Sequence, residues 1–230
     1  MKRFLIICSL VSIGNSVNLH AQNSMFDLGL EGGPNLSTML ISSSNPAFDF
    51  NPDPAIFGSG GFIFQYNFKN FLSLKSGLSY QRKGYQIKDL NYTDQSGNPI
   101  GNGRASSRFD YLTFPVLVKA SFGKKVHFFV NAGPYVGYLL SKTDLMKING
   151  NKTIYKDPLD ATGINRWDFG IASGVGISIP VRTYWAISVE LRNYSGLLDL
   201  TASNTTKWLT NTTDLRVGVA YKLGFYKDAE

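Results

Sequence analysis

The sequence offers few side chains that could act as a base, a nucleophile or a metal ligand. It contains two histidines, His20 and His127, and one cysteine, Cys8. Catalysis by a serine usually depends on a neighbouring histidine as the base, and structural zinc sites are built from clusters of histidine and cysteine. His127 stands alone after the Lys124-Lys125 pair, so we interpret it as a polar side chain at a membrane interface. We therefore predict no enzyme, no catalytic residue, no metal site and no cofactor.

Charged residues recur at alternate positions in segments that are otherwise rich in glycine, serine and asparagine. In a strand, alternate side chains point to the same face of a sheet, so these charges share one face with the small residues. An isolated charge in a dry, narrow interior would cost several kcal/mol, so opposite charges must pair there. We expect a structural network of inward-facing charges, with a gated pore as the alternative. The predicted network consists of Glu31, Lys75, Lys119, Asp168, Glu190, Arg192, Asp214, Arg216 and Lys222.

Strands must position these charges, because apolar and polar residues alternate with a period of two. Leu112, Phe114 and Val116, for example, lie on one face of their segment and Lys119 lies on the other. Five segments show this alternation clearly: 111–120, 127–140, 168–179, 185–192 and 214–225. Three earlier segments show it less regularly: 27–37, 57–68 and 71–82. We predict eight strands.

The connections between the predicted strands alternate strictly in length. Long connections, rich in Asn, Ser, Thr, Gly and Pro, cover 38–55, 83–107, 141–165 and 196–212, and short turns lie between them. In an up-and-down meander, alternate connections lie at opposite ends of the sheet. Short periplasmic turns with long outer loops are typical of outer-membrane barrels. The predicted fold is all-β, an eight-stranded antiparallel up-and-down transmembrane β-barrel with four long outer loops and short periplasmic turns.

A secreted, lipocalin-like barrel would also give eight alternating strands. Such a barrel holds its large apolar residues inside, whereas here glycine, serine and the charges share the face that suits a narrow interior. The apolar face then needs lipid around it. Aromatic residues near the strand ends, among them Phe122, Phe128 and Trp185 at short turns and Tyr80 and Trp167 toward long connections, resemble two interfacial girdles. These features favour a membrane barrel.

The beginning of the chain resembles an export signal. Lys2 and Arg3 precede an apolar run from Phe4 to Ile13, and Ala21 precedes a plausible cleavage site. The apolar run is too short for a transmembrane helix, which needs roughly 20 residues. We predict a cleaved signal peptide over 1–21 and a single barrel domain over 22–230, located in the outer membrane of a Gram-negative cell.

The positive charge of the chain does not indicate a nucleic-acid partner. The 23 basic and 16 acidic residues give a formal net charge of +7, which falls to +5 without Lys2 and Arg3. Most of this excess lies in the predicted short turns, at Lys69, Lys124, Lys125 and Arg182. A nucleic-acid backbone would need a basic stripe. The pattern instead favours a positive rim among anionic lipid headgroups, or ordinary solvated turns.

Six segments together resemble the PorT-like outer-membrane β-barrel proteins. They occur in order from the first predicted strand to the last, so the resemblance covers nearly the whole predicted barrel domain. The resemblance implies an eight-stranded outer-membrane barrel, and some members of that family are tied to a secretion apparatus. The segments are Leu28–Ser37, Tyr111–Lys119, Val130–Tyr138, Asp168–Gly176, Glu190–Tyr194 and Leu215–Leu223.

We therefore predict a non-enzymatic outer-membrane β-barrel that acts as a scaffold or interaction module and presents long extracellular loops. The alternatives are an accessory component of a protein secretion or assembly machine and a small-solute pore, which the narrow barrel disfavours. Expected partners are outer-membrane lipid and lipopolysaccharide, secretion-system proteins or surface polysaccharide, and no nucleic acid. The loop residues expected to make such contacts are Tyr85, Tyr92, Phe109, Trp167 and Trp208.

Overall fold

The computed structural model describes residues 24–43, 52–69, 71–93, 99–148, 151–156, 158, 163–201 and 206–225. The predicted signal peptide over 1–21 lies outside these ranges. Within them, no helix is long and apolar enough to cross a membrane. The described strands are β1 (Ser24–Ser43), β2 (Ala55–Lys69), β3 (Leu72–Thr93), β4 (Pro99–Phe122), β5 (His127–Ile148), β6 (Asn151–Tyr155), β7 (Trp167–Arg182), β8 (Trp185–Gly196) and β9 (Thr206–Phe225).

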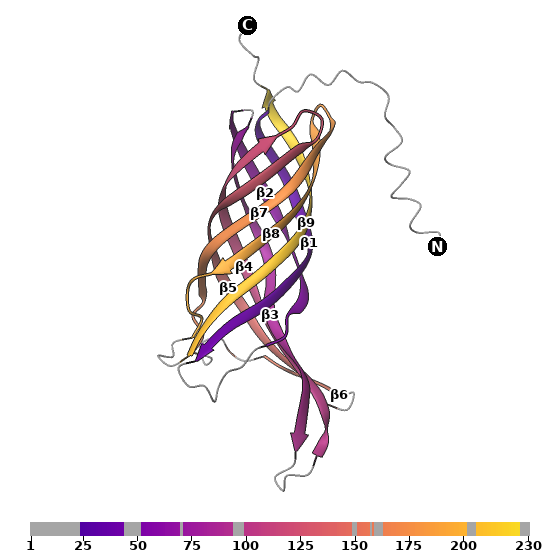
Figure 1. The fold of residues 1–230 in the computed structure, drawn as a ribbon, viewed down its shortest axis with the longest axis vertical. Coiled ribbons are helices and arrows are strands. Elements are labelled where there is room, and N and C mark those ends of the chain that lie inside the picture. Colours follow the sequence, from indigo (N-terminus) through magenta and orange to yellow (C-terminus); the bar gives the residue numbers. More distant parts are fainter. Residues whose placement is uncertain are drawn as a thin grey trace, which may run out of the picture.

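The sheet closes on itself (Figure 1). Its hydrogen-bonded order is β4-β3-β2-β1-β9-β8-β7-β5, and β5 pairs with β4 to complete the ring. All of these pairs are antiparallel. Each strand of the ring therefore has a hydrogen-bonded neighbour on both sides, and the fold is the predicted all-β, up-and-down architecture.

The ninth strand, β6, differs from the predicted count of eight. The alternating pattern predicts one long connection over 141–165, whereas β5 continues to Ile148 and the chain turns back as β6. Among the described residues, the five residues of β6 pair only with β5, and they are exposed along their whole length. The hairpin lies beyond the ring, and the residues of β6 show no apolar period.

The strands β3 and β4 also extend further than the alternating pattern predicts. Tyr85 pairs with Ser107, and Leu90 pairs with Gly103, inside the predicted connection 83–107. The ladder between β4 and β5 likewise continues to the Gly103–Ile148 pair. We call the extended parts of β3, β4 and β5, together with β6, the projecting sheet; it leaves the ring at the end that carries the long connections (Figure 1).

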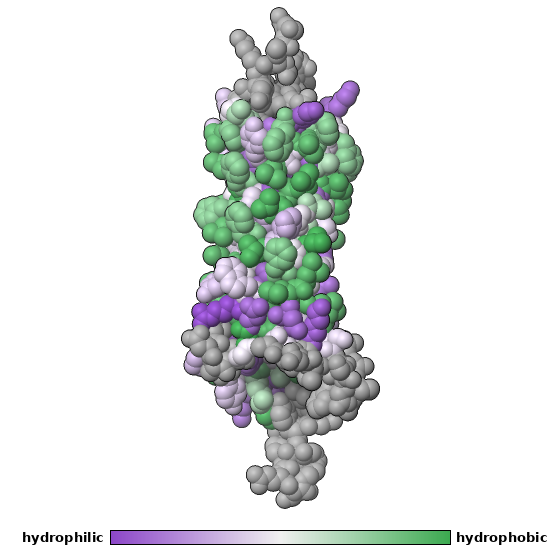
Figure 2. Space-filling view, turned by 90° about the vertical axis from the view of Figure 1, so that its left-hand side faces the viewer, coloured by the Kyte–Doolittle hydropathy of each residue, from purple (hydrophilic) through white to green (hydrophobic). Residues whose placement is uncertain are grey.

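Apolar side chains cover the outside of the ring. Leu30, Phe62, Val175 and Leu191 all point outward and are exposed, Phe62 to 69%. The visible face in Figure 2 shows a broad apolar band, followed by a hydrophilic belt toward the long connections. Inward positions alternate with these residues, so every second side chain of a ring strand enters the interior.

Candidate functional site: a filled barrel interior and a cleft at its mouth

Two carboxylates and three cations form the centre of the interior. Lys75 Nζ lies 2.8 Å from Glu31 Oε2 and 2.7 Å from Glu190 Oε2. Arg192 joins the same two carboxylates, at 2.9 Å from Glu31 and 2.6 Å from Glu190. Arg216 Nη1 lies 2.7 Å from Glu31 Oε1. None of these five residues is more than 5% exposed, so each buried charge has an oppositely charged partner.

Asp214 extends this centre on the side of β9. Its Oδ2 lies 2.6 Å from Arg216 Nη2 and accepts a hydrogen bond of 2.9 Å from Ser59 Oγ. Gln81 Nε2 donates to both carboxylate oxygens at 3.1 Å. The carboxylate is fully buried, and these donors replace the water that it has lost.

A second ion pair lies further toward the long connections and includes Lys83, which is not among the nine predicted inward charges. Lys83 Nζ lies 2.7 Å from Asp168 Oδ2, and both side chains are fully buried. The rings of Tyr111, Tyr135 and Tyr194 surround the ammonium group, with centroids at 5.3, 4.7 and 5.6 Å. Aromatic faces attract a cation, so the three rings supplement the single carboxylate.

The nine charges predicted to face inward do not all join this network. Eight are buried: Glu31, Lys75, Lys119, Asp168, Glu190, Arg192, Asp214 and Arg216. Among the described residues, Lys119 has no ion-pair partner; its Nζ donates to Gln65 Oε1 at 3.0 Å and lies 4.2 Å from the centroid of Phe129. Lys222 is half-buried near the short turns, opposite Asp27 in the ladder, so it lies apart from the central cluster.

An apolar layer covers the charged centre on the side of the long connections. Its rings and aliphatic chains come from β1, β3, β4, β5 and the segment before β9. The buried members are Met39, Tyr85, Phe109, Tyr111, Leu139 and Leu200. Ile41, Ile87, Ile164 and Trp208 pack against them and are partly buried.

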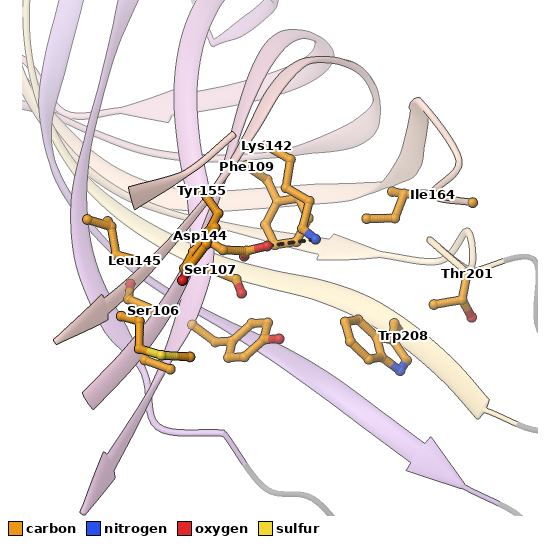
Figure 3. Close-up of a pocket in the computed structure, with 14 residues that line it drawn as sticks. Ser106, Ser107, Phe109, Lys142, Asp144, Leu145, Tyr155, Ile164, Thr201 and Trp208 are labelled. Atoms are coloured by element: carbon orange, nitrogen blue, oxygen red, sulfur yellow. Dashed lines mark ion pairs between the residues drawn. The ribbon is translucent and has the colours of Figure 1, made fainter. Parts of the chain in front are cut away.

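A cleft of about 720 Å³ opens on the side of this apolar layer that faces the long connections (Figure 3). Ser107, Asp144 and Tyr155 lie on the side of the projecting sheet, and Thr201 and Trp208 lie across from them. Lys142 Nζ and Asp144 Oδ2 form an ion pair of 2.9 Å in the wall. Of the aromatic contact residues predicted from sequence, Tyr85, Phe109 and Trp208 line this cleft. Trp167 lies on the outer surface of the ring instead, and the side chain of Tyr92 lies outside the described residues.

Asp199 fixes the position of Trp208 at the cleft. Its Oδ1 accepts hydrogen bonds from the backbone N–H groups of Trp208, at 2.9 Å, and Thr201, at 3.0 Å. Burial acts to raise the pKa of Asp199, but these bonds outweigh it, so the pKa lies below its usual value. The carboxylate therefore stays ionised at neutral pH and holds the two ends of the 201–208 connection together.

The lining of the cleft can contact a ligand through both apolar and polar groups. Its lining combines aromatic and aliphatic side chains with one ion pair and a few hydroxyl groups. Among the described residues there is no group of three or more His, Cys, Asp or Glu side chains that could hold a metal ion. His127 lies at the opposite end of the ring, at the beginning of β5, where it is half-buried.

Comparison with known proteins identifies the kind of barrel. The family model for the outer membrane protein beta-barrel domain matches residues 20–202. No curated protein matches the sequence. Neisserial surface protein A is a similar solved structure, with 15% identity, a TM-score of 0.46, and coverage of 87% of this chain and 98% of that one.

Two further solved structures show a comparable likeness. OprG from Pseudomonas aeruginosa is 10% identical, with a TM-score of 0.45, over 88% of this chain and 98% of that one. Ail, the attachment invasion locus protein of Yersinia pestis, is 12% identical, with a TM-score of 0.38, over 86% and 98% of the two chains.

Proposed function

The chain belongs to the outer membrane protein beta-barrel domain family and is an outer-membrane β-barrel protein, and from this premise we propose that it is a non-enzymatic scaffold or interaction module. It would hold its projecting sheet and long connections on the outer surface of the cell. Short periplasmic turns and long outer loops are the usual orientation of such barrels. The finer PorT-like assignment and a role in a secretion or assembly machine stay predictions.

The filled interior is the observation that carries this proposal. β3 and β8 are separated by β2, β1 and β9 on one side of the ring and by β4, β5 and β7 on the other, so they face each other across it. The 2.7 Å pair between Lys75 and Glu190 therefore joins opposite walls. Lys83 and Asp168 make a second cross-connection between β3 and β7. Ion pairs that span a narrow barrel leave its interior filled with side chains rather than with a water column.

The surface beyond the ring supports an interaction role. The projecting sheet gives the long connections a hydrogen-bonded frame, and in the part of the chain that the structure describes β6 has a neighbouring strand on one side only. An exposed strand edge can pair with a strand of another chain. The cleft at the base of this sheet adds an aromatic contact surface, at which Tyr85 and Trp208 meet edge to face with centroids 6.2 Å apart.

Conductance across a planar bilayer tests the proposal. We expect the purified full chain to give no stable unitary currents, because the ion pairs block the interior. The double variant Lys75→Ala with Glu190→Ala removes one cation and one anion together, so it opens space without stranding a charge. We expect brief, small currents from this variant alone. Long openings of constant amplitude from the unmodified chain would show that the barrel is a pore.

Mild cross-linking followed by co-purification distinguishes the scaffold role from a role as a component of a secretion or assembly machine. A lone barrel after cross-linking favours the scaffold. A stable complex with proteins of a secretion or assembly apparatus favours the alternative.

A further inference from the structure

An aromatic row marks the outer limit of the apolar band. Tyr80 pairs with Leu112, Leu112 with Tyr138, and Tyr138 with Trp167, so four outward side chains lie side by side on β3, β4, β5 and β7. The rings of Tyr138 and Trp167 lie 5.0 Å apart. Tyrosine and tryptophan prefer the level of the lipid headgroups. Outward residues one ladder step beyond this row therefore lie among the headgroups of the outer leaflet.

Arg82 occupies that next step and is held in place. Its Nε lies 2.6 Å from Asp110 Oδ1, and its Nη2 donates to Tyr80 Oη at 3.1 Å. Ser141 Oγ donates a further hydrogen bond of 2.9 Å to Asp110 Oδ2. The side chain of Arg82 is still 37% exposed, so the fixed guanidinium remains accessible from the lipid side.

Arg108 lies one further step along the same outward face of β4. It stands opposite Gly84, which has no side chain to cover it, and its guanidinium lies 5.8 Å from the ring centroid of Phe57. Its Nε is buried from water and has no hydrogen-bond partner among the described residues. No carboxylate in those residues lies within ion-pairing distance of it. Arg108 is therefore a cation, two outward positions beyond the aromatic row, that no carboxylate of the described residues neutralises.

We propose that Arg108 and Arg82 bind the phosphorylated headgroup of an outer-leaflet glycolipid of the lipopolysaccharide class. Two guanidinium groups face one carboxylate here, so one positive charge remains for a ligand. The planar fork of arginine matches a phosphate group with two parallel hydrogen bonds. Tyr80 and Phe57 add ring surface beside the cations, where the sugar and the upper acyl chains of such a lipid would lie. The site is formed by the ring wall, so it is independent of the proposed scaffold role.

Native mass spectrometry of the full chain in neutral detergent micelles tests this site, with diphosphorylated lipid A added as the probe. We expect the unmodified chain to retain diphosphorylated lipid A, and to bind the dephosphorylated form about tenfold more weakly, because charge-assisted hydrogen bonds are lost. We expect Arg108→Gln to lose a similar factor for the diphosphorylated lipid. Arg108→Lys should recover part of it.

Arg104→Gln is the matched control. Arg104 lies on the same strand and the same face, but is exposed and four residues further out on the projecting sheet, roughly 13 Å beyond Arg108. We expect it to bind like the unmodified chain. Thermal unfolding of each variant in the same micelles shows that the barrel is intact. Unchanged lipid binding in Arg108→Gln, or equal binding of the two lipid A forms, would overturn the proposal.

Discussion

Arg216 shows at the scale of one residue why the interior charges depend on each other. It contacts Glu31 and Asp214 at once, and it is fully buried. The loss of this cation would leave the negative charge of its partners where water cannot reach it. Removing one partner of a buried ion pair costs much more folding free energy than replacing both partners with apolar residues.

Replacing Arg216 with leucine should therefore destabilise the barrel. We expect Arg216→Leu to lower the free energy of unfolding by roughly 3–5 kcal/mol. Urea unfolding in detergent micelles measures this change. Arg182→Leu removes an exposed arginine at a short turn and should change little. Equal unfolding midpoints for the unmodified chain and Arg216→Leu would contradict the proposed role of the network.

The alternation of residue types predicts which face a charge occupies, but not which partner it contacts. Glu190 and Arg216 are direct neighbours in the β8–β9 ladder, yet the ion pairs of Glu190 go to Arg192 and Lys75. Long side chains extend across the interior. Which partner each one contacts depends on the curvature of the ring, and the sequence of a single strand does not determine that curvature. The sequence does not predict Lys83 as an inward charge, because the apolar alternation ends at Arg82.

At the scale of strands, the close approach of β2 and β3 depends on a glycine. A Cβ atom at Gly61 would collide with the backbone of Leu78 and Ser79 on the neighbouring strand. At the adjacent Gly60, on the opposite face, the nearest atom to an added Cβ would be Glu31 O at an ordinary 3.5 Å. At position 61 the inner face of this strand pair therefore has room for a hydrogen atom only.

A pair of alanine variants tests this difference. We expect Gly61→Ala to lower the free energy of unfolding by about 1–3 kcal/mol, since the two strands must shift apart. Gly60→Ala should have an effect near zero. Urea unfolding in micelles gives both values. A similar loss in the two variants would mean that strand propensity, rather than the close approach, governs this position.

The predictability of the strands depends on where each part of the strand lies. Within the apolar band, lipid demands an apolar residue at every second position, so the ring portions of β4, β5, β7, β8 and β9 follow from sequence. The projecting sheet lies beyond the apolar band, so lipid does not require an apolar residue at every second position there. The exposed strand β6 carries no periodic signal, so its sequence reads as an ordinary polar loop.

At the scale of the whole molecule, the outer surface is built for lipid. The exposed apolar side chains extend around the ring strands, and Phe62 near the middle of β2 is among the most exposed of them. Composition alone gives a mean hydropathy of -0.09, which conceals this arrangement. Periodicity reveals the band, but the biological task depends on surfaces that lie beyond it.

A charge placed in the band should destabilise the barrel only where lipid surrounds it. We expect Phe62→Arg to lower the free energy of unfolding in lipid vesicles by roughly 2–4 kcal/mol, as for arginine near the middle of a bilayer. Tyr155→Arg, on the exposed strand β6, should leave it unchanged. Urea unfolding in vesicles measures both. Similar values for the two variants would show that Phe62 does not face the bilayer.

The pairing of β1 with β9 has a consequence for the order of events in folding. Ser24 pairs with Phe225, so the ring closes only after the last strand has arrived. Until then the edges of β1 and β9 are unpaired, and Glu31 on β1 lacks its ion pair with Arg216 on β9. Joining such distant segments is entropically slow. Closure is therefore the late, committing step of assembly, and a chain interrupted before β9 would remain open and prone to aggregation.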